Sequence, residues 1–354
     1  MRPRILILYN MPVLPLDHPD AGSEHDIIDT VANTARVLEA AGFEVRRLGI
    51  NYDPQPLLDE VRLNRPAAVF NLFEGLATQT GTEVSVAALM EWLNLPFTGS
   101  PSAALALGRD KVRTKHLLAG ADLPTPDFVR IDRPPVPRWR RHWPAIVKPA
   151  CQDASVGIDQ ASVVTSQAQL EERARYVLSE YGPPVMVERF VFGREFHINL
   201  IEEWVGGAPR RLRVLPLAEI EFLDTRPGHW PVYTFAAKWK TESDEYKATP
   251  LHTGVAISDE PAERLRQLAE KAFRLLQCRD YARLDVRMSE DGRFHILEVN
   301  PNPYLNSQAL VRGMAAIGKS HEQLIVDLAL AAMARGGTVV PEGMIHIPVG
   351  ASQA

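Results

Sequence analysis

The fold is decided within residues 282–300, which have the sequence ARLDVRMSEDGRFHILEVN. An Asp-Gly pair in the middle of this stretch is typical of a hairpin turn, because such turns need a residue that adopts positive φ. Side chains alternate along a strand. Arg283 and Asp285 therefore share one face of the first strand, and Glu298 and Asn300 share one face of the second. If these faces coincide, an arginine, two carboxylates and an amide gather at one place.

This hairpin predicts a magnesium site. Carboxylate and amide oxygens are the hard ligands that suit Mg²⁺ rather than zinc. Because proteins commonly hold Mg²⁺ with one or two carboxylates and the phosphates of a substrate, Asp285, Glu298 and Asn300 also indicate a nucleotide. The alternative is a solvated hairpin whose charges pair across the strands, and the hairpin alone leaves both interpretations open.

The composition excludes several classes of protein. The chain has 354 residues, of which 45% are hydrophobic and 23% charged, as expected for a globular protein of about two domains. Its net charge of -5 lacks the basic surplus that a nucleic-acid partner requires, and no run approaches the ~18 apolar residues of a membrane span. Two distant cysteines, Cys151 and Cys278, exclude a disulfide framework and a structural zinc site. We therefore expect a cytoplasmic protein with no nucleic-acid or membrane partner.

The first third of the chain predicts a parallel sheet. Apolar runs and helical periods alternate there, and this β-α-β order places helices on both faces of such a sheet. Prolines crowd residues 124–144 and mark a crossing between domains, because proline cannot continue a helix or serve a central strand. The expected elements are a strand at 5–8, a helix capped by Ser23, a strand at 43–48, a helix at 56–64, a strand at 67–72 and helices at 82–93 and 109–119.

Other polar residues could complete a nucleotide site. Lys111 stands at the start of a helix, and Lys148 follows the apolar strand 145–147, where a lysine can project into a cleft as a charge for phosphate. The small residues of loop 150–158 let backbone N–H groups approach phosphates, although the loop is not a Walker A sequence. Segment 188–195 could offer its backbone to a base edge and a carboxylate to ribose hydroxyls. Taken singly, the lysines and glutamates among these features are better explained as ordinary surface residues, and the loop is a weak signal.

One ordered set of motifs runs along nearly the whole chain. It consists of Phe70-Asn71-Leu72 with Glu74-Gly75, Leu95-Pro96-Phe97-Thr98-Gly99-Ser100, Asp110-Lys111 with Thr114-Lys115, Leu123-Pro124-Thr125-Pro126, Ile146-Val147-Lys148-Pro149, Ser155-Val156-Gly157, Glu188, Gly193-Arg194-Glu195, Arg283-Leu284-Asp285 and Leu297-Glu298-Val299-Asn300-Pro301. Each motif is weak alone, but their joint order and spacing are specific. The set resembles the ATP-grasp superfamily and, within it, the D-alanine–D-alanine ligase family.

The resemblance implies a mixed α/β (α+β) ATP-grasp fold with an N-terminal Rossmann-like domain. The expected divisions are an N-terminal α/β domain at 1–122, a central lobe at 123–205 and a C-terminal lobe with the metal site at 206–354. ATP would be gripped between the second and third lobes.

The resemblance also implies a role for each matched residue. ATP would contact Lys111 and Lys148 through its phosphates, Glu195 through its ribose, Glu188 and Val191 along its adenine edge, and Lys238 and Leu297 elsewhere. Two Mg²⁺ ions, or Mn²⁺ in their place, would bind Asp285, Glu298 and Asn300. Arg283 would face the developing oxyanion, Ser155 would lie in the closing loop, and Glu24 would meet the ammonium of the first amino-acid substrate. For Glu24, simple complementarity to a helix dipole is the open alternative.

The amino-acid pocket departs from the family's pattern. The replaced positions are Glu74 (His in the family), Thr82-Glu83-Val84 (Glu-Asp-Gly), Ala154 (Ser), Trp239 (Tyr), Tyr304 (Gly) and Ala309 (Ser), while Leu310 is retained. Because a pocket built on hydrogen bonds discriminates strongly, we expect a different pair of substrates. The residues expected to line their pocket are Glu74, Trp239, Tyr304, Ala309 and Leu310. Glu74 would meet an ammonium or a basic side chain, with a surface glutamate beside a turn as the alternative.

The expected reaction joins a small acid to an amine. A carboxylate resists amine attack, whereas an acyl phosphate made with the γ-phosphoryl group of ATP is a good electrophile. Lysines and Mg²⁺ offset charge on the transferring group. We therefore expect a ligase that converts ATP, an acid and an amine into ADP, phosphate and an amide, as a monomer or a homodimer. The alternative is a catalytically inactive nucleotide-binding module on the same scaffold.

Overall fold

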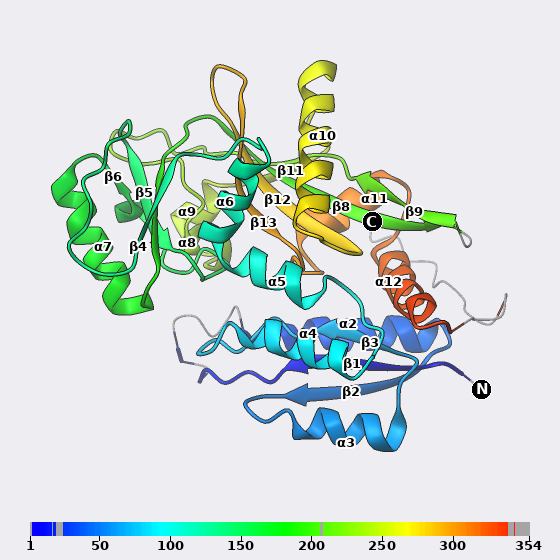
Figure 1. Cartoon of the computed structure of the whole chain (residues 1–354). Coiled ribbons are helices and arrows are strands. Elements are labelled where there is room, and N and C mark those ends of the chain that lie inside the picture. The colour runs from blue at the N-terminus through cyan, green and yellow to red at the C-terminus, as the bar shows by residue number, and fades with distance from the viewer. Residues whose placement is uncertain (1, 16, 19–23, 206–207, 339–342, 344–354) are drawn as a thin grey trace.

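The computed structural model describes residues 2–15, 17–18, 24–205, 208–338 and 343. In this part of the chain, three sheets form three lobes (Figure 1). The N-terminal sheet is parallel and has the order β2-β1-β3. Its elements are β1 (Arg4–Asn10), α2 (Ile27–Ala40), β2 (Glu44–Ile50), α3 (Gln55–Asn64), β3 (Ala68–Leu72), α4 (Thr82–Trp92), α5 (Ser102–Arg109) and α6 (Lys111–Gly120).

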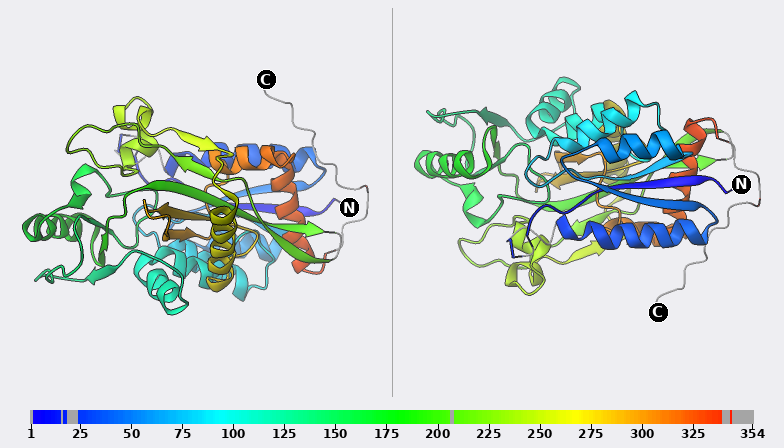
Figure 2. Two further views of the ribbon diagram at one scale, coloured as in Figure 1. Left: turned by 90° about the horizontal axis from the view of Figure 1, so that it is seen from above. Right: turned by 90° about the horizontal axis from the view of Figure 1, so that it is seen from below.

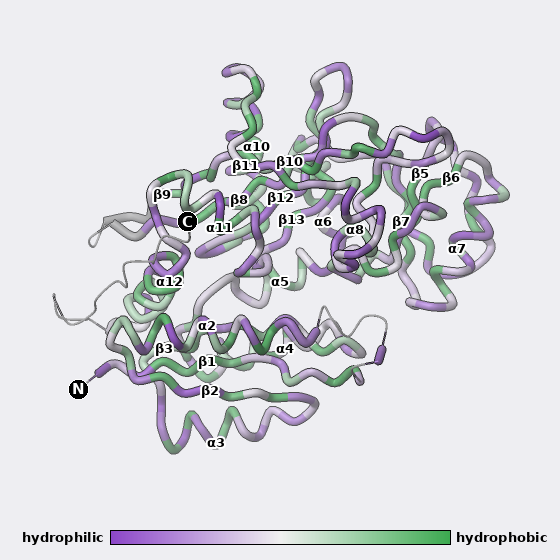
Figure 3. The backbone as a smooth tube through the Cα atoms, turned by 180° about the vertical axis from the view of Figure 1, so that it is seen from behind, coloured by the Kyte–Doolittle hydropathy of each residue, from purple (hydrophilic) through white to green (hydrophobic). Residues whose placement is uncertain are grey.

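Strand β1 is buried on both faces. Ile5 and Ile7 belong to one hydrophobic cluster with α2, and Leu6 and Leu8 belong to another with α3 and α4. The alternation follows from the period of two along a strand, and Figure 3 shows hydrophobic colour along β1. Helix α2 begins after Asp26, whose side chain caps no backbone N–H. The expected cap, Ser23, lies outside the described residues.

The central sheet is antiparallel and stands apart at one side of the molecule (Figure 2). Its order is β4-β7-β5-β6, and α7 packs on it. Ser166 caps α7 by accepting a hydrogen bond from the backbone N–H of Gln169. The elements are β4 (Phe128–Ile131), β5 (Ala145–Pro149), the 3₁₀ turn η1 (Gln160–Ser162), β6 (Val163–Val164), α7 (Gln167–Tyr181) and β7 (Val185–Arg189).

The third sheet has the order β11-β10-β8-β12-β13, with β9 pairing with β8. Its strands are β8 (Arg194–Val205), β9 (Ala208–Val214), β10 (Ala218–Ile220), β11 (Leu251–Thr253), β12 (Tyr281–Met288) and β13 (Phe294–Asn300). The helices around it are α8 (Phe235–Trp239), α9 (Asp244–Lys247), α10 (Asp259–Leu275), α11 (Gln308–Ala316) and α12 (His321–Arg335). By strand pairing β8 belongs to this sheet, so the expected division at 205/206 falls inside the sheet. The chain crosses between the two sheets near 190–193 instead.

The last helix returns to the N-terminal sheet. Residues of α12 such as Leu324 and Leu328 share one hydrophobic cluster with α2 and β3. Arg335 at its end pairs with the buried Asp280, with 2.6 Å between Nη1 and Oδ1. The first and third lobes are therefore joined by a common core. None of the helices described here is long and apolar enough to cross a membrane.

Candidate active site

The hairpin β12–β13 brings the predicted polar residues to one face. Arg283 lies opposite Asn300 and Asp285 opposite Glu298, and the register shifts only after Asp285. Arg283 donates from Nε to Asp285 Oδ1 at 2.7 Å and from Nη2 to Oδ2 at 3.0 Å. Its Nη2 also lies 3.7 Å from Glu298 Oε1. The alternation inferred from the sequence thus corresponds to a single cluster, in which Arg283 and Asp285 are buried and Glu298 and Asn300 are half-buried.

This cluster fits a hard cation. Burial raises the pKa of Asp285, but the adjacent Arg283 guanidinium outweighs burial and holds the pKa well below its usual range. Burial raises the pKa of Glu298, and Lys111 only partly offsets this effect. No group of three or more His, Cys, Asp or Glu side chains among the described residues could hold a metal ion. Two carboxylates and the Asn300 amide therefore need further oxygens, which the phosphates of a nucleotide supply to Mg²⁺.

Two lysines share one buried carboxylate behind this face. Lys115 Nζ lies 2.7 Å from Glu188 Oε2, and Lys148 Nζ lies 2.5 Å from Glu188 Oε1. Burial raises the pKa of Glu188, but the two ammonium groups prevail and lower it to about 2. Burial lowers the pKa of Lys115 to about 8. The Glu188 carboxylate, which Lys148 also contacts, raises this pKa by less than the loss of hydration lowers it. The trio carries an excess positive charge that suits a phosphate.

A small cavity of about 90 Å³ joins these groups to the hairpin. Its walls include most of the residues that the nucleotide prediction named, although Lys238 lines the larger cavity described below and Lys111 lines neither cavity. The lining residues include Lys148, Ser155, Glu188, Val191, Glu195, Asp285, Leu297 and Glu298. The walls also contain Phe190, which packs edge-on against Phe192 and Trp230. An apolar wall beside backbone polar groups and a cationic end is the composition that a nucleotide needs.

An unpredicted arginine organises the end of this cavity that contains Glu195. Arg287 donates from Nε to Glu195 Oε2 at 2.8 Å and from Nη1 to the Val191 carbonyl at 2.8 Å. Its guanidinium also lies over the Phe190 ring, 5.2 Å from the centroid. The same period of two that places Arg283 and Asp285 on this face also places Arg287 there, so the sequence contained the signal.

The loop between β5 and the 3₁₀ turn contributes residues to the walls of both cavities. Ala154 and Ser155 have φ of 56° and 62°. The Ser155 hydroxyl donates to the Tyr233 carbonyl at 3.0 Å, and Trp239 Nε1 donates to the Ala154 carbonyl at 3.0 Å. Lys111 Nζ donates to the Gln152 carbonyl at 2.5 Å and lies 3.5 Å from Glu298 Oε2. Lys111 therefore ties the loop to the oxygen-rich face of the hairpin.

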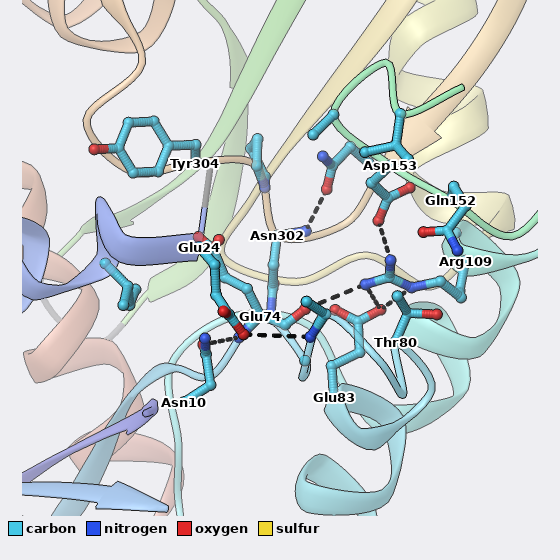
Figure 4. Close-up of a pocket in the computed structure, with 18 of the residues that line it drawn as sticks. Asn10, Glu24, Glu74, Thr80, Glu83, Arg109, Gln152, Asp153, Asn302 and Tyr304 are labelled. Carbon is cyan, nitrogen blue, oxygen red and sulfur yellow. Dashed lines mark hydrogen bonds and ion pairs between the residues drawn. The ribbon is translucent and has the colours of Figure 1, made fainter. Parts of the chain in front are cut away.

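A larger cavity of about 570 Å³ lies between this face and the N-terminal domain. Figure 4 shows its charged wall, where Arg109 bridges Glu83 at 2.7 Å and Asp153 at 2.6 Å. Glu24 accepts hydrogen bonds from the backbone N–H groups of Val13 at 2.9 Å and Leu14 at 2.8 Å. Both of these bonds go to Oε2, and the Ala77 N–H donates to Oε1 at 3.4 Å. Backbone groups thus orient the Glu24 carboxylate, as a ligand-binding group would need.

Comparison with known proteins decides the family. A family model described as "D-ala D-ala ligase C-terminus" matches residues 117–329. The chain belongs to the D-alanine–D-alanine ligase family. A D-alanine–D-alanine ligase of Alcanivorax borkumensis is 33% identical over 265 residues, which cover 75% of this chain and 78% of that protein. An uncharacterised protein of Sinorhizobium fredii, y4sG, is 31% identical over 258 residues, 73% of this chain and 72% of its own.

The fold agrees with this assignment. The crystal structure of the Bacillus anthracis D-alanine–D-alanine ligase complexed with ATP has a TM-score of 0.71 to this chain at 18% identity, and covers 94% of this chain and 97% of that one. The ATP-grasp resemblance and the mixed α/β fold are thereby confirmed. The family assignment makes the chain an ATP-dependent ligase.

Two positions expected in the substrate pocket of this ligase lie elsewhere. Ala309 and Leu310 begin α11, are 2% and 1% exposed, and line neither cavity. Their side chains pack into the interior because α11 lies against the third sheet and Leu310 joins the cluster under α12.

The other expected pocket residues do line the larger cavity. Glu24, Glu74, Trp239 and Tyr304 are all in its walls, together with Lys238, Arg283, Glu298 and Asn300. Burial lowers the pKa of Lys238 to about 8, so its charge is weakly held. The Tyr304 hydroxyl accepts a hydrogen bond from Thr30 on α2 at 3.2 Å.

Proposed function

We propose that this ligase activates a small acid as an acyl phosphate and joins it to an amine, and that its substrate pair differs from two D-alanines. One observation carries the proposal. Glu298 lines both cavities, so the smaller cavity and the larger cavity meet at the oxygen-rich face. Phosphoryl transfer from ATP to an acid in the larger cavity would take place at this junction.

The chain's own residues supply binding and charge. Lys148 and Lys111 would hold phosphate oxygens, and Glu195 would accept hydrogen bonds from the ribose. Asp285, Glu298 and Asn300 would hold Mg²⁺, which when bound offsets charge on the transferring phosphoryl group. Arg283, held in place by Asp285, would stabilise the tetrahedral oxyanion that forms when the amine attacks. Loss of one such donor typically lowers the rate by ~10²–10³.

The substrate pair is inferred from the replaced positions. Trp239 donates its ring N–H to the Ala154 carbonyl, so a backbone contact holds the loop and no serine hydroxyl is offered to a substrate at Ala154. Glu74 adds a carboxylate to the wall of the larger cavity. These differences change both the hydrogen bonds and the charge that a bound amino acid would meet, and a polar pocket rejects ligands that leave its groups unpaired.

A phosphate-release screen tests the proposal. Wild-type protein with ATP, Mg²⁺ and pairs of amino acids in both enantiomers should release phosphate with at least one pair, and Asp285→Ala should abolish the release. Full activity of Asp285→Ala would refute the metal assignment. D-alanine turnover at rates typical of the family would refute a changed substrate pair. ATP binding without phosphate release from any pair would favour the inactive nucleotide-binding module.

A further inference from the structure

The wall of the larger cavity carries more acid than base. Six carboxylates line it against three Lys and Arg side chains and one histidine. The acids are Glu24, Glu74, Glu83, Asp153, Glu180 and Glu298, and the bases are Arg109, Lys238, Arg283 and His18. A ligand that fills this space meets a negative surplus, which favours a cationic group.

Most of these charges already have partners in the wall or directly beside it. Arg109 bridges Glu83 and Asp153, and Arg283 is engaged by both oxygens of Asp285. Lys111 lies near Glu298, and Glu24 is satisfied by backbone N–H groups.

Among the described residues, Glu74 and Glu180 are the two of these acids whose carboxylates accept no hydrogen bond and form no ion pair. Of the two, Glu74 belongs to the N-terminal domain. It follows β3, and its backbone is fixed at both ends: its N–H donates to Asn10 Oδ1 at 3.1 Å, and its carbonyl accepts from Arg109 Nη2 at 3.3 Å. Its side chain lines the cavity (Figure 4). Within the described part of the chain, no residue donates a hydrogen bond to its carboxylate or forms an ion pair with it. The backbone of Glu74 is held in place while its carboxylate is free to bind another molecule, which is the arrangement expected of a ligand-binding group.

We propose that the acid substrate of this ligase carries a basic side chain, an amine or guanidine that is protonated at neutral pH, and that Glu74 binds this cation. The inference rests on the proposed function, because the reacting carboxylate would lie at the Glu298 face while the remainder of the molecule extends toward Glu74. The substrate class is then that of diamino or guanidino acids rather than of alanine.

The protonation of Glu74 agrees with this assignment. Glu74 is exposed to the open space of the cavity, and desolvation by the surrounding walls raises its pKa to about 7, more than Arg109 lowers it. A bound cation would favour the ionised carboxylate, so affinity for a basic substrate should rise with pH through about 7 and level off above that. The other charged groups that act on Glu74 are Asp26 before α2, Lys238 on α8 and Asp153 in the closing loop, and Glu83 on α4 also titrates near 7.

Matched pairs of ligands provide the test. Lysine, ornithine and 2,4-diaminobutyrate, in both enantiomers, are compared with norleucine, norvaline and 2-aminobutyrate, which have the same chains without the terminal nitrogen. Binding is measured by calorimetry on the full chain with Mg²⁺ and a non-hydrolysable ATP analogue. At least one basic ligand should bind about tenfold or more tightly than its neutral counterpart, as expected for one charged hydrogen bond.

Two variants distinguish a direct contact between Glu74 and the ligand from a general attraction by the negative charge of the cavity. Glu74→Gln should remove the preference and its rise with pH. Glu180→Gln, which removes a charge from α7 at the same cavity, should retain both. Equal binding of basic and neutral ligands to the wild type, or a preference that survives in Glu74→Gln, would overturn the inference.

The inference and the proposed function fail differently. Glu74-dependent binding of a basic ligand, with no phosphate release from any amine partner, supports the cation site and refutes the ligase reaction. Phosphate release from neutral pairs only, with no preference for basic ligands, supports the reaction and refutes the cation site.

Discussion

Replacing Glu188 by glutamine should destabilise the protein severely. The change removes the one carboxylate that Lys115 and Lys148 share at 2.7 and 2.5 Å. Lys115 is 1% and Glu188 2% exposed, so water cannot replace the lost charge. Removing one partner of a buried ion pair typically costs about 3–5 kcal/mol.

The pKa of Glu188 leads to a similar magnitude. A fall from 4.5 to about 2 corresponds to about 3 kcal/mol in favour of the charged, folded form at neutral pH. This contribution is present above the unfolded pKa of 4.5 and is lost as the pH falls toward 2. Lys115 acts with the opposite sign, because burial lowers its pKa to about 8. Its cost to the folded state is present at neutral pH and disappears as the pH rises from 8 to 10.5.

Urea unfolding followed by circular dichroism measures the effect. We expect Glu188→Gln to lose about 3 kcal/mol or more at pH 7.5, and the double variant Glu188→Gln/Lys115→Met to recover part of the loss by removing one unpaired ammonium. The wild type should gain stability between pH 2 and 4.5 through this carboxylate. A Glu188→Gln protein within 1 kcal/mol of the wild type, or a double variant that is no more stable than the single one, would refute the reasoning.

Three further outcomes follow from the site. Arg287→Met should raise the KM for ATP about tenfold or more with a smaller effect on kcat, since a charged hydrogen bond to Glu195 is worth about 1.5–3 kcal/mol. The control variant Arg287→Lys should restore part of the affinity for ATP. An unchanged KM in Arg287→Met would contradict this role. Activity should fall as the pH rises through about 8, where Lys238 loses its proton, and a pH profile of Lys238→Arg should lack this limb. Gly157→Ala should slow phosphate release and make the loop more mobile, as measured by hydrogen exchange. The reason is that φ of Gly157 is 74° and the added Cβ would lie 2.8 Å from Pro149 Cγ. Exchange in this loop at the wild-type rate would show that the site accommodates a methyl group.

Sequence reasoning reached the parts of the site that depend on local order. The alternation along 282–300 placed Arg283, Asp285, Glu298 and Asn300 on one face, and the pairing of β12 with β13 brings them together. The strand that ends at Lys148 was likewise expected, and Lys148 lines the smaller cavity.

Contacts between distant segments were beyond such reasoning. Strands β8 to β11 were not predicted as one sheet, because antiparallel pairing between segments about 30 residues apart leaves no local period; Ala218 on β10, for example, pairs with both His197 and Thr253. The pairing of Lys115 with Glu188 has the same origin. Leu310 was assigned to the substrate pocket from its place in a motif, whereas the packing of α11 directs it into the core.

The amino-acid order by itself determined which faces of which strands carry oxygen ligands and cations. It therefore determined that a magnesium nucleotide and a phosphoryl transfer are expected. Only the folded chain decided how the charges are shared. Two lysines compete for Glu188, Arg287 engages Glu195, and the Glu74 carboxylate has no partner among the residues that the structure describes. The reason is physical, because alternation along a strand is set by backbone geometry within a few residues, whereas the pairing of a buried charge depends on which distant group approaches within a few ångströms.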